Sequence, residues 1–197
     1  MSKEEISKRI IEAAVAEFLA RGLDGSIMEN IAREANVSKR TLYKYFPNKE
    51  AIFDSLTLDL LEATCAVPPV SYSKTESFKS QLEKMLDRKA EMLTDEKYVQ
   101  ISKLVFSEFM KGRQLSEGHQ AKFYESERKF LKWIDAAKKA GAITSKQSSE
   151  LISNQIHSNL KGQLFYPVIF GLKKLKSSDI KQAKAVTMEF VLKSFCG

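Results

Sequence analysis

Apolar residues recur three and four positions apart along most of the chain, which is the spacing that places them on one face of an α-helix. Ile6, Ile10, Ala14 and Phe18 form the first of these stripes. Stretches in which apolar and polar residues alternate are few, and the 197 residues include only 8 glycines and 4 prolines. The pattern therefore predicts an all-α protein of about nine helices.

Capping residues predict where the first two helices meet. Gly22 follows the first stripe, at the position where glycine commonly ends a helix. The hydroxyl of Ser26 can cap a short second helix, and Glu29, three residues later, would complete a capping box. We therefore expect the second helix to begin at Ser26.

A third short helix is predicted after a tight turn. Asn36 tolerates the left-handed backbone that such a turn needs, and Ser38 can cap a helix that begins at Lys39. Because Pro47 disfavours helix at the residue before it, this helix is expected to end there. Asn48 can then cap a long fourth helix.

The same periodicity predicts further helices near 75–94, 96–110, 117–140, 146–171 and 178–195. The stretch from Val67 to Ser71 contains two adjacent prolines and is the clearest break in the chain. Pro167 interrupts one of the later helices and predicts a kink there. We expect two domains, residues 1–50 and residues 51–197.

Composition excludes several classes of protein. Hydrophobic residues make up 43% of the chain and charged residues 29%, which is typical of a globular protein. The first residues lack the apolar run of a secretory signal, and the apolar stretches are too short to span a membrane. Two distant cysteines support neither a disulfide framework nor a zinc site. We therefore expect a cytoplasmic protein with no membrane partner.

Two short helices joined by a tight turn are the layout of a helix-turn-helix, which sets its second helix in the major groove of DNA. Leu42 and Phe46 predict the buried face of that helix. Its opposite face, with Lys39, Arg40, Tyr43 and Lys44, would meet the duplex. Arg40 and Lys39 can donate to guanine edges, while Thr41 and Tyr43 offer hydroxyls and apolar surface for phosphate or a thymine methyl. Lys49 begins the next helix, where backbone N–H groups also attract phosphate. Judged by charge alone, a solvated basic face is the alternative.

The segment 22–53, GLDGSIMENIAREANVSKRTLYKYFPNKEAIF, closely resembles the DNA-binding domain of the TetR family of bacterial transcriptional regulators. The resemblance covers about residues 5–55. It implies a homodimer that binds a palindromic operator in double-stranded DNA, with an N-terminal three-helix DNA-binding domain and a larger helical C-terminal domain for an effector. It also implies DNA contacts at Ser26, Ser38, Lys39, Arg40, Thr41, Tyr43, Tyr45 and Lys49.

The last two long helices are the expected dimer interface. Residues 133–170 resemble the ligand domain of one branch of the family less closely, and in such folds the last two helices pair with those of a second subunit. Apolar stripes run along both helices, through Leu151, Ile152, Ile156 and Leu160 and through Ile180, Ala183, Val186, Phe190 and Val191. A core within one subunit would explain the same stripes, so both explanations stay open.

Aromatic residues gather in the C-terminal part, where some could line an apolar cavity with a few polar groups. Phe123 and Phe170 belong to this group, and the candidates for effector contact are Phe106, Phe109, Phe130, Trp133, His157, Phe165 and Tyr166. Most aromatic residues there would be ordinary core, and a lone histidine is usually a satisfied polar residue. No cluster with metal-ligand spacing surrounds His157 or His119, so we expect no metal and no cofactor.

The net charge of +7 does not by itself indicate DNA binding. Residues 1–50 carry 9 basic and 8 acidic residues, and residues 51–197 carry 23 basic and 17 acidic ones. The local signature of DNA binding is instead the segment 35–49, which has four basic residues and no acidic one. The C-terminal excess is either a solvated face or a bias toward an anionic effector.

The expected function is that of a sequence-specific transcriptional regulator, most often a repressor that a small-molecule effector releases from its operator. The alternative is a TetR-like architectural or nucleoid-associated DNA-binding factor without an effector, which a C-terminal domain lacking a cavity would favour. The sequence contains no catalytic motif and no pair of catalytic residues, so we do not expect an enzyme.

Overall fold

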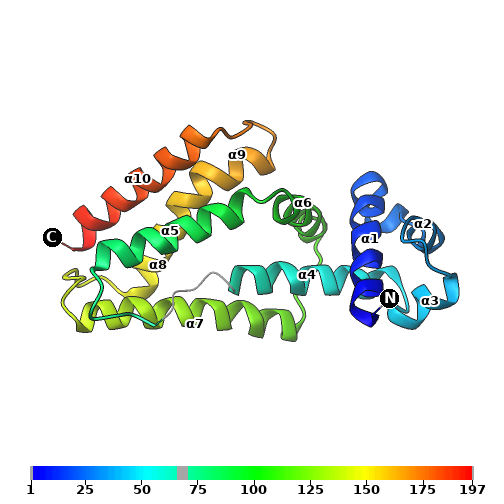
Figure 1. Cartoon of the computed structure of the whole chain (residues 1–197), viewed down its shortest axis with the longest axis horizontal. Helices are drawn as coiled ribbons and strands as arrows, with labels where there is room; N and C mark the ends of the chain where they lie inside the picture. Colours follow the sequence, from blue (N-terminus) through cyan, green and yellow to red (C-terminus); the bar gives the residue numbers. More distant parts are fainter. Residues whose placement is uncertain (1, 66–70, 197) are drawn as a thin grey trace. The chain divides into compact units, whose positions relative to one another are not determined.

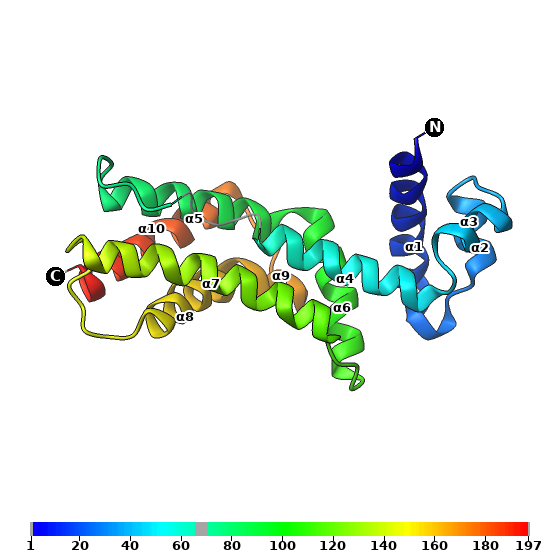
Figure 2. The same cartoon turned by 90° about the horizontal axis from the view of Figure 1, so that it is seen from below.

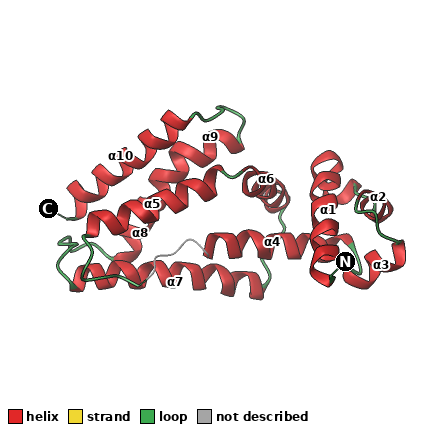
Figure 3. Ribbon diagram, in the orientation of Figure 1, coloured by secondary structure: helices red, strands yellow, loops and turns green. Residues whose placement is uncertain are grey.

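The computed structural model describes residues 2–65 and 71–196, and every regular element within them is a helix (Figures 1 and 3). This confirms the all-α class. If the unbroken helical run from 149 to 169 is taken as one element, the described residues form about nine helices, as expected. Apart from Ser71, the predicted break from Val67 to Ser71 lies outside the described residues.

The chain forms two compact units. The N-terminal unit contains Met1–Leu61 and Gln100–His119, and the C-terminal unit contains Glu62–Val99 and Gln120–Gly197. Three helices hold residues of both units, namely α4 (Lys49–Cys65), α6 (Glu96–Met110) and α7 (Glu117–Lys139). The functional boundary at residue 50 stays a prediction.

Three helices begin the N-terminal unit: α1 (Lys3–Gly25), α2 (Met28–Glu34) and α3 (Lys39–Tyr45) (Figure 1). The apolar stripe of α1 is buried from Ile10 to Phe18, and it packs against α2. Gly22 has a φ of 68°, which confirms the left-handed position that the sequence predicts at the end of the regular part of α1.

The prediction that Ser26 caps the second helix is wrong. The N-cap residue of α2 is Ile27, whose side chain makes no capping hydrogen bond. The Ser26 hydroxyl instead donates to the carbonyl oxygen of Gly22, at 2.5 Å. A carboxylate from α1 serves the start of α2: Oε1 of Glu17 accepts hydrogen bonds from the Ile27 amide at 3.2 Å and from Asn30 Nδ2 at 3.0 Å.

The turn before α3 and both ends of that helix agree with the sequence. Asn36 has a φ of 49°, and the Ser38 hydroxyl accepts the amide hydrogen of Thr41 at 3.0 Å. Phe46 is extended, as expected for a residue that precedes proline. Oδ1 of Asn48 accepts the amide hydrogen of Ala51 at 2.8 Å, which caps α4.

The core of the N-terminal unit joins α1 to α4 with the later half of α6. Ile101, Leu104 and Val105 of α6 lie in the same buried cluster as Leu42 and Phe53. Polar contacts tie the segment after residue 100 to the same unit: Lys111 bridges Asp24 and Glu108, His119 contacts the Asp54 carbonyl, and the Arg113 guanidinium lies 4.7 Å from the centre of the Phe53 ring. Residues 100–119 are therefore firmly attached to the helix-turn-helix part of the chain.

The C-terminal unit is built from five further helical elements, α5 (Phe78–Thr94), α8 (Ser149–Leu160), η1 (Lys161–Phe165), α9 (Tyr166–Ile169) and α10 (Ser177–Phe195), together with parts of α4, α6 and α7 (Figure 2). Helix α10 packs against α5 and α8. The core between these helices contains Leu82, Trp133, Ile156 and Phe195.

A π-helical turn interrupts the long helix that the sequence predicts over 146–171. The turn η1 separates α8 from α9, and the amide of Tyr166 donates to the carbonyl of Lys161, five residues earlier. Pro167 lies in the first turn of α9 and has no N–H to continue the hydrogen bonding of the preceding turn. The predicted irregularity at Pro167 therefore takes the form of a widened turn directly before the proline.

Candidate nucleic-acid interface and ligand cavity

Helix α3 has one buried and one exposed face. Leu42 is completely buried and Phe46 nearly so, which confirms the predicted inward pair. Lys39, Arg40, Tyr43 and Lys44 are exposed together on the opposite face. Because apolar contacts hold the helix on the unit through one side only, its basic side stays available to a partner such as the major groove.

The basic groups around α3 differ in how they are engaged. Nζ of Lys39 lies 3.1 Å from Oε1 of Glu29 on α2, and this hydrogen bond lowers the pKa of Glu29 below its usual value. Arg40 and Lys44 have no ion-pair partner within the part of the chain that the structure describes. Nζ of Lys49 donates to the carbonyl oxygen of Asp24 at 2.5 Å. The most readily available cations on α3 are thus Arg40 and Lys44.

The other predicted DNA contacts are less exposed. Thr41 and Tyr45 are half-buried, and Tyr45 packs against the core of the N-terminal unit. Ser38 is exposed and shares a hydrogen bond with the Thr41 hydroxyl at 2.8 Å. Ser26 is only 7% exposed and its hydroxyl is already bonded. A phosphate contact by Ser26 would need its backbone amide or a rearranged side chain, and it stays a prediction.

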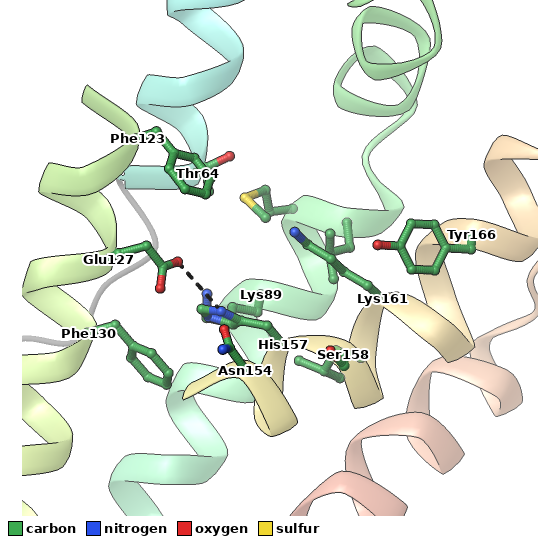
Figure 4. Close-up of a pocket in the computed structure, with 13 residues that line it drawn as sticks. Thr64, Lys89, Phe123, Glu127, Phe130, Asn154, His157, Ser158, Lys161 and Tyr166 are labelled. Carbon is green, nitrogen blue, oxygen red and sulfur yellow. Dashed lines mark ion pairs between the residues drawn. The ribbon is translucent and has the colours of Figure 1, made fainter. Parts of the chain in front are cut away.

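The aromatic residues predicted for an effector cavity are divided by the fold. Phe130, His157 and Tyr166 line one cavity in the C-terminal unit (Figure 4). Trp133 and Phe165 lie in the buried core of that unit without lining the cavity. Phe106 and Phe109 belong to the N-terminal unit, so they are not brought together with the other five.

The cavity has a volume of about 290 Å³ and lies among α5, α7, the run from α8 to α9, and the end of α4. Its apolar wall consists of Met92, Leu93, Phe123, Phe130, Leu160 and Tyr166. Its polar wall consists of Thr64, Lys89, Glu127, Asn154, His157, Ser158 and Lys161. Sites for small molecules combine apolar walls with convergent polar groups, and this cavity has both, with polar residues forming about half of its lining.

Charged side chains from three elements line this cavity: Lys89 from α5, Glu127 from α7 and Lys161 from η1 (Figure 4). Burial lowers the pKa of Lys89 to about 8, with the charge of Lys161 lowering it further and that of Glu127 opposing the change. Burial also lowers the pKa of Lys161. Burial, and then the charges of Lys89 and Lys161, lower the pKa of His157 far below its usual value, which favours the neutral imidazole.

The histidine is held between a carboxylate and an aromatic ring. Nδ1 of His157 lies 3.7 Å from Oε1 of Glu127, and the imidazole stacks on Phe130 with ring centres 4.9 Å apart. Its Nε2 atom is buried and makes no hydrogen bond with the described residues. Such an unsatisfied nitrogen is a candidate partner for a polar group of a ligand.

Sequence reasoning did not single out Lys89 and Glu127, although a signal was present. Lys89 occupies the helical stripe that contains Leu82, Leu86 and Leu93, all of which are buried. On α7, Glu127 lies three residues before Phe130 and therefore falls on the same helical stripe as this aromatic residue. A charged residue at an apolar position of a helix has two explanations. Either the buried face of the helix has been assigned wrongly, or the charged residue belongs to a buried polar site.

The described residues contain no group of three or more histidine, cysteine, aspartate or glutamate side chains that could hold a metal ion. Among the same residues, no helix combines the length and apolar character needed to cross a membrane.

Comparison with known proteins identifies both parts of the chain. Residues 10–56 match the family model described as bacterial regulatory proteins of the tetR family, and residues 80–192 match the model of the C-terminal domain of AefR-like transcriptional repressors. Together these matches contain the helix-turn-helix and nearly all of the residues that line the cavity.

Individual relatives agree with the family models. The HTH-type transcriptional repressor SCO4008 of Streptomyces coelicolor is 28% identical over 142 residues, which cover 72% of this chain and 69% of that protein. The HTH-type transcriptional regulator RutR of Escherichia coli strain K12 is 32% identical over 108 residues, which cover 55% of this chain and 50% of RutR.

Solved structures share the fold along nearly the whole chain. A TetR family transcriptional regulator from Pseudomonas syringae pv. tomato strain DC3000 aligns with a TM-score of 0.76 and 28% identity over 95% of both chains. The flavonoid-responsive regulator FrrA aligns with a TM-score of 0.71 and 27% identity over 99% of this chain and 98% of its own. These proteins are regulators, in agreement with the expectation that the chain is not an enzyme. The chain belongs to the TetR family of bacterial regulatory proteins and is a DNA-binding transcriptional regulator.

Proposed function

We propose that this protein is a repressor that a small-molecule effector releases from its operator. The observation that carries the proposal is the cavity of about 290 Å³, lined by charged and aromatic groups, in a chain that also has an exposed basic recognition helix. The name of the relative SCO4008 describes a repressor, and that of FrrA describes a regulator responsive to flavonoids. The alternative, an architectural DNA-binding factor without an effector, is less well supported because it predicts a C-terminal domain without a cavity.

The proposed interface with DNA is the exposed face of α3 with the starts of the neighbouring helices. Arg40 and Lys39 suit bidentate donation to guanine, and Lys44 and Lys49 suit phosphates. Because the chromosome is the target, we place the protein in the bacterial cytoplasm.

We also propose that the protein binds DNA as a homodimer through α8 and α10. The predicted apolar stripes divide in the structure: Ile152, Ile156, Leu160, Ala183 and Val191 are buried within the unit's own core. Leu151 and Val186 remain 42% and 43% exposed. A second copy of the chain would cover these exposed side chains, and a two-fold dimer would match the two halves of a palindromic operator.

The proposed coupling between effector and DNA uses helices that hold residues of both units. Thr64, near the end of α4, lines the cavity, while α4 begins at Lys49 directly after the recognition helix. Since α6 and α7 also hold residues of both units, a ligand that displaces them can change the separation of the two recognition helices. The effector can shift this equilibrium only as far as it prefers the conformation that does not bind DNA.

The DNA-binding part of the proposal is tested by selecting binding sites from a pool of random duplexes and then measuring affinities by fluorescence anisotropy. Arg40→Ala should weaken binding to the selected site by about 1 to 3 kcal/mol if Arg40 contacts a base, with a smaller effect on a scrambled duplex. Lys49→Ala should weaken both duplexes about equally and flatten the salt dependence. Lys84→Ala, which removes an exposed cation from α5, serves as the control. Unchanged affinity for both α3-region variants would rule out this interface.

A further inference from the structure

Lys89 is an unusual residue for its position. Its side chain comes from the buried face of α5, and the residue is only 7% exposed. Nζ lies 5.2 Å from the centre of the Phe130 ring, and it has neither a hydrogen bond nor an ion pair with the described residues. A buried ammonium group is costly, and the Phe130 ring and the charge of Glu127 offset only part of that cost, so an anionic group in the cavity would be stabilised beside it.

A second cation approaches the same space from another element. Lys161 is the first residue of the π-helical turn and also lines the cavity (Figure 4). It too has no ion-pair partner within the described residues. Turns of this kind cost regular hydrogen bonding and occur frequently at functional sites. Here the turn presents the Lys161 side chain together with the following Tyr166 on the cavity wall.

One carboxylate offsets part of this positive charge. Glu127 is the acidic residue that lines the cavity, and it is already engaged with His157 and with the Ser153 hydroxyl, whose Oγ lies 3.5 Å from Oε2. His157 contributes no charge, so two lysines face one glutamate and the lining carries an excess of one positive charge. The uncompensated charge would attract an anion and repel a cation.

We propose that the cavity binds a small organic anion, a carboxylate on an apolar body, with its anionic group placed between Lys89 and Lys161. The proposal rests on the proposed function in that it takes this cavity as the effector site. A cavity of about 290 Å³ has room for the volume of about ten water molecules, which suits a ligand with one ring. Phe123, Phe130 and Tyr166 would contact that ring, and the two ammonium groups would donate to its carboxylate.

Three probes of similar shape and different charge test the proposal on the full-length protein at pH 7: benzoate, benzamide and benzylamine. Binding is measured by titration calorimetry and by the fluorescence of Trp133, the single tryptophan, whose ring centre lies 6.0 Å from that of Phe130. Benzoate should bind about tenfold to a hundredfold more tightly than benzamide, and benzylamine should bind most weakly. A probe in the cavity should change Trp133 fluorescence, because Phe130 lines the cavity and stacks on Trp133.

Lysine variants test which groups recognise the anion. Lys89→Met and Lys161→Met should each weaken benzoate binding about tenfold or more and leave benzamide binding nearly unchanged. Glu127→Gln should strengthen benzoate binding, because it removes the opposing charge. Lys84→Met is the matched control, since Lys84 lies on the same helix as Lys89 with its side chain 66% exposed. Thermal melts establish that each variant is folded. If Lys89→Met does not fold, Lys161→Met still tests the proposal.

The outcomes separate this inference from the proposed function. Equal or tighter binding of benzamide, or benzoate binding that is insensitive to both lysine substitutions, overturns the anion preference. Selective benzoate binding that leaves the affinity for the selected DNA site unchanged supports the anion preference and contradicts the effector role. If none of the three probes binds, the anion proposal is wrong, whereas the proposed function is decided by its own DNA-binding measurements.

Discussion

The Lys89→Met substitution should stabilise the protein at neutral pH. Burial lowers the pKa of Lys89 from 10.5 to about 8, and each tenfold loss of proton affinity corresponds to about 1.36 kcal/mol. Keeping the ammonium charged therefore costs the folded state about 3 kcal/mol. Methionine has a similar length and no charge, so replacing Lys89 should raise the unfolding free energy at pH 7 by up to that amount.

The effect has a defined pH window. Because the unfolded chain binds the Lys89 proton more tightly than the folded protein does, wild-type stability rises with pH between the two pKa values. The destabilisation is complete below about pH 8 and disappears as the pH approaches 10.5. The advantage of Lys89→Met over the wild type should therefore shrink across this interval.

Urea unfolding at several pH values from 7 to 10.5, at one fixed protein concentration, measures the difference between the two proteins. Trp133 fluorescence reports the unfolding of the C-terminal unit. Lys84→Met should change the unfolding free energy by less than about 1 kcal/mol, because exposed ion pairs contribute little. A lower stability of Lys89→Met at pH 7, or a difference that does not decrease with pH, would refute the reasoning.

Three further outcomes follow from other parts of the structure. Glu29→Gln removes the partner of Lys39 and should raise the affinity for selected and scrambled duplexes alike, measured by anisotropy; a loss of affinity would contradict this. Asn36→Gly should change the unfolding free energy little while Asn36→Ala lowers it by about 1 kcal/mol, because alanine is strained at a φ of 49°; equal stability of the two variants in urea would show that the turn relaxes. If the proposed homodimer forms through this face, Leu151→Glu combined with Val186→Glu should convert it to monomer in sedimentation velocity, and an unchanged sedimentation coefficient would exclude this face as the interface.

The helix-turn-helix could be predicted from sequence because its signals are local. Ser38, Asn48 and Pro47 act on backbone groups within three residues, and Asn36 acts on its own φ angle. Ser26 shows where this reasoning fails. The start of α2 is served by a carboxylate from α1, ten residues away in sequence, and this contact forms only when the two helices pack.

The ligand cavity could be predicted only in outline. Helical spacing indicates which face of a helix is apolar, but it does not indicate which other helix that face meets. For this reason Phe106 and Phe109 lie in a different compact unit from Phe130, although all three follow similar patterns. The burial of Lys89 depends on the packing of α5 and α7 with the α8–η1 run, so periodicity marks the residue as unusual without giving its surroundings.

We propose that anion binding in the cavity and DNA binding by α3 are linked in one protein. The most direct test is to measure the affinity for the selected DNA site with and without saturating benzoate, and the affinity for benzoate with and without that DNA. Linkage requires both affinities to fall by the same factor, which we expect to lie between about 5 and 150. If both ligands bind but neither affinity changes, the protein binds DNA and an anion independently, and the claim is wrong.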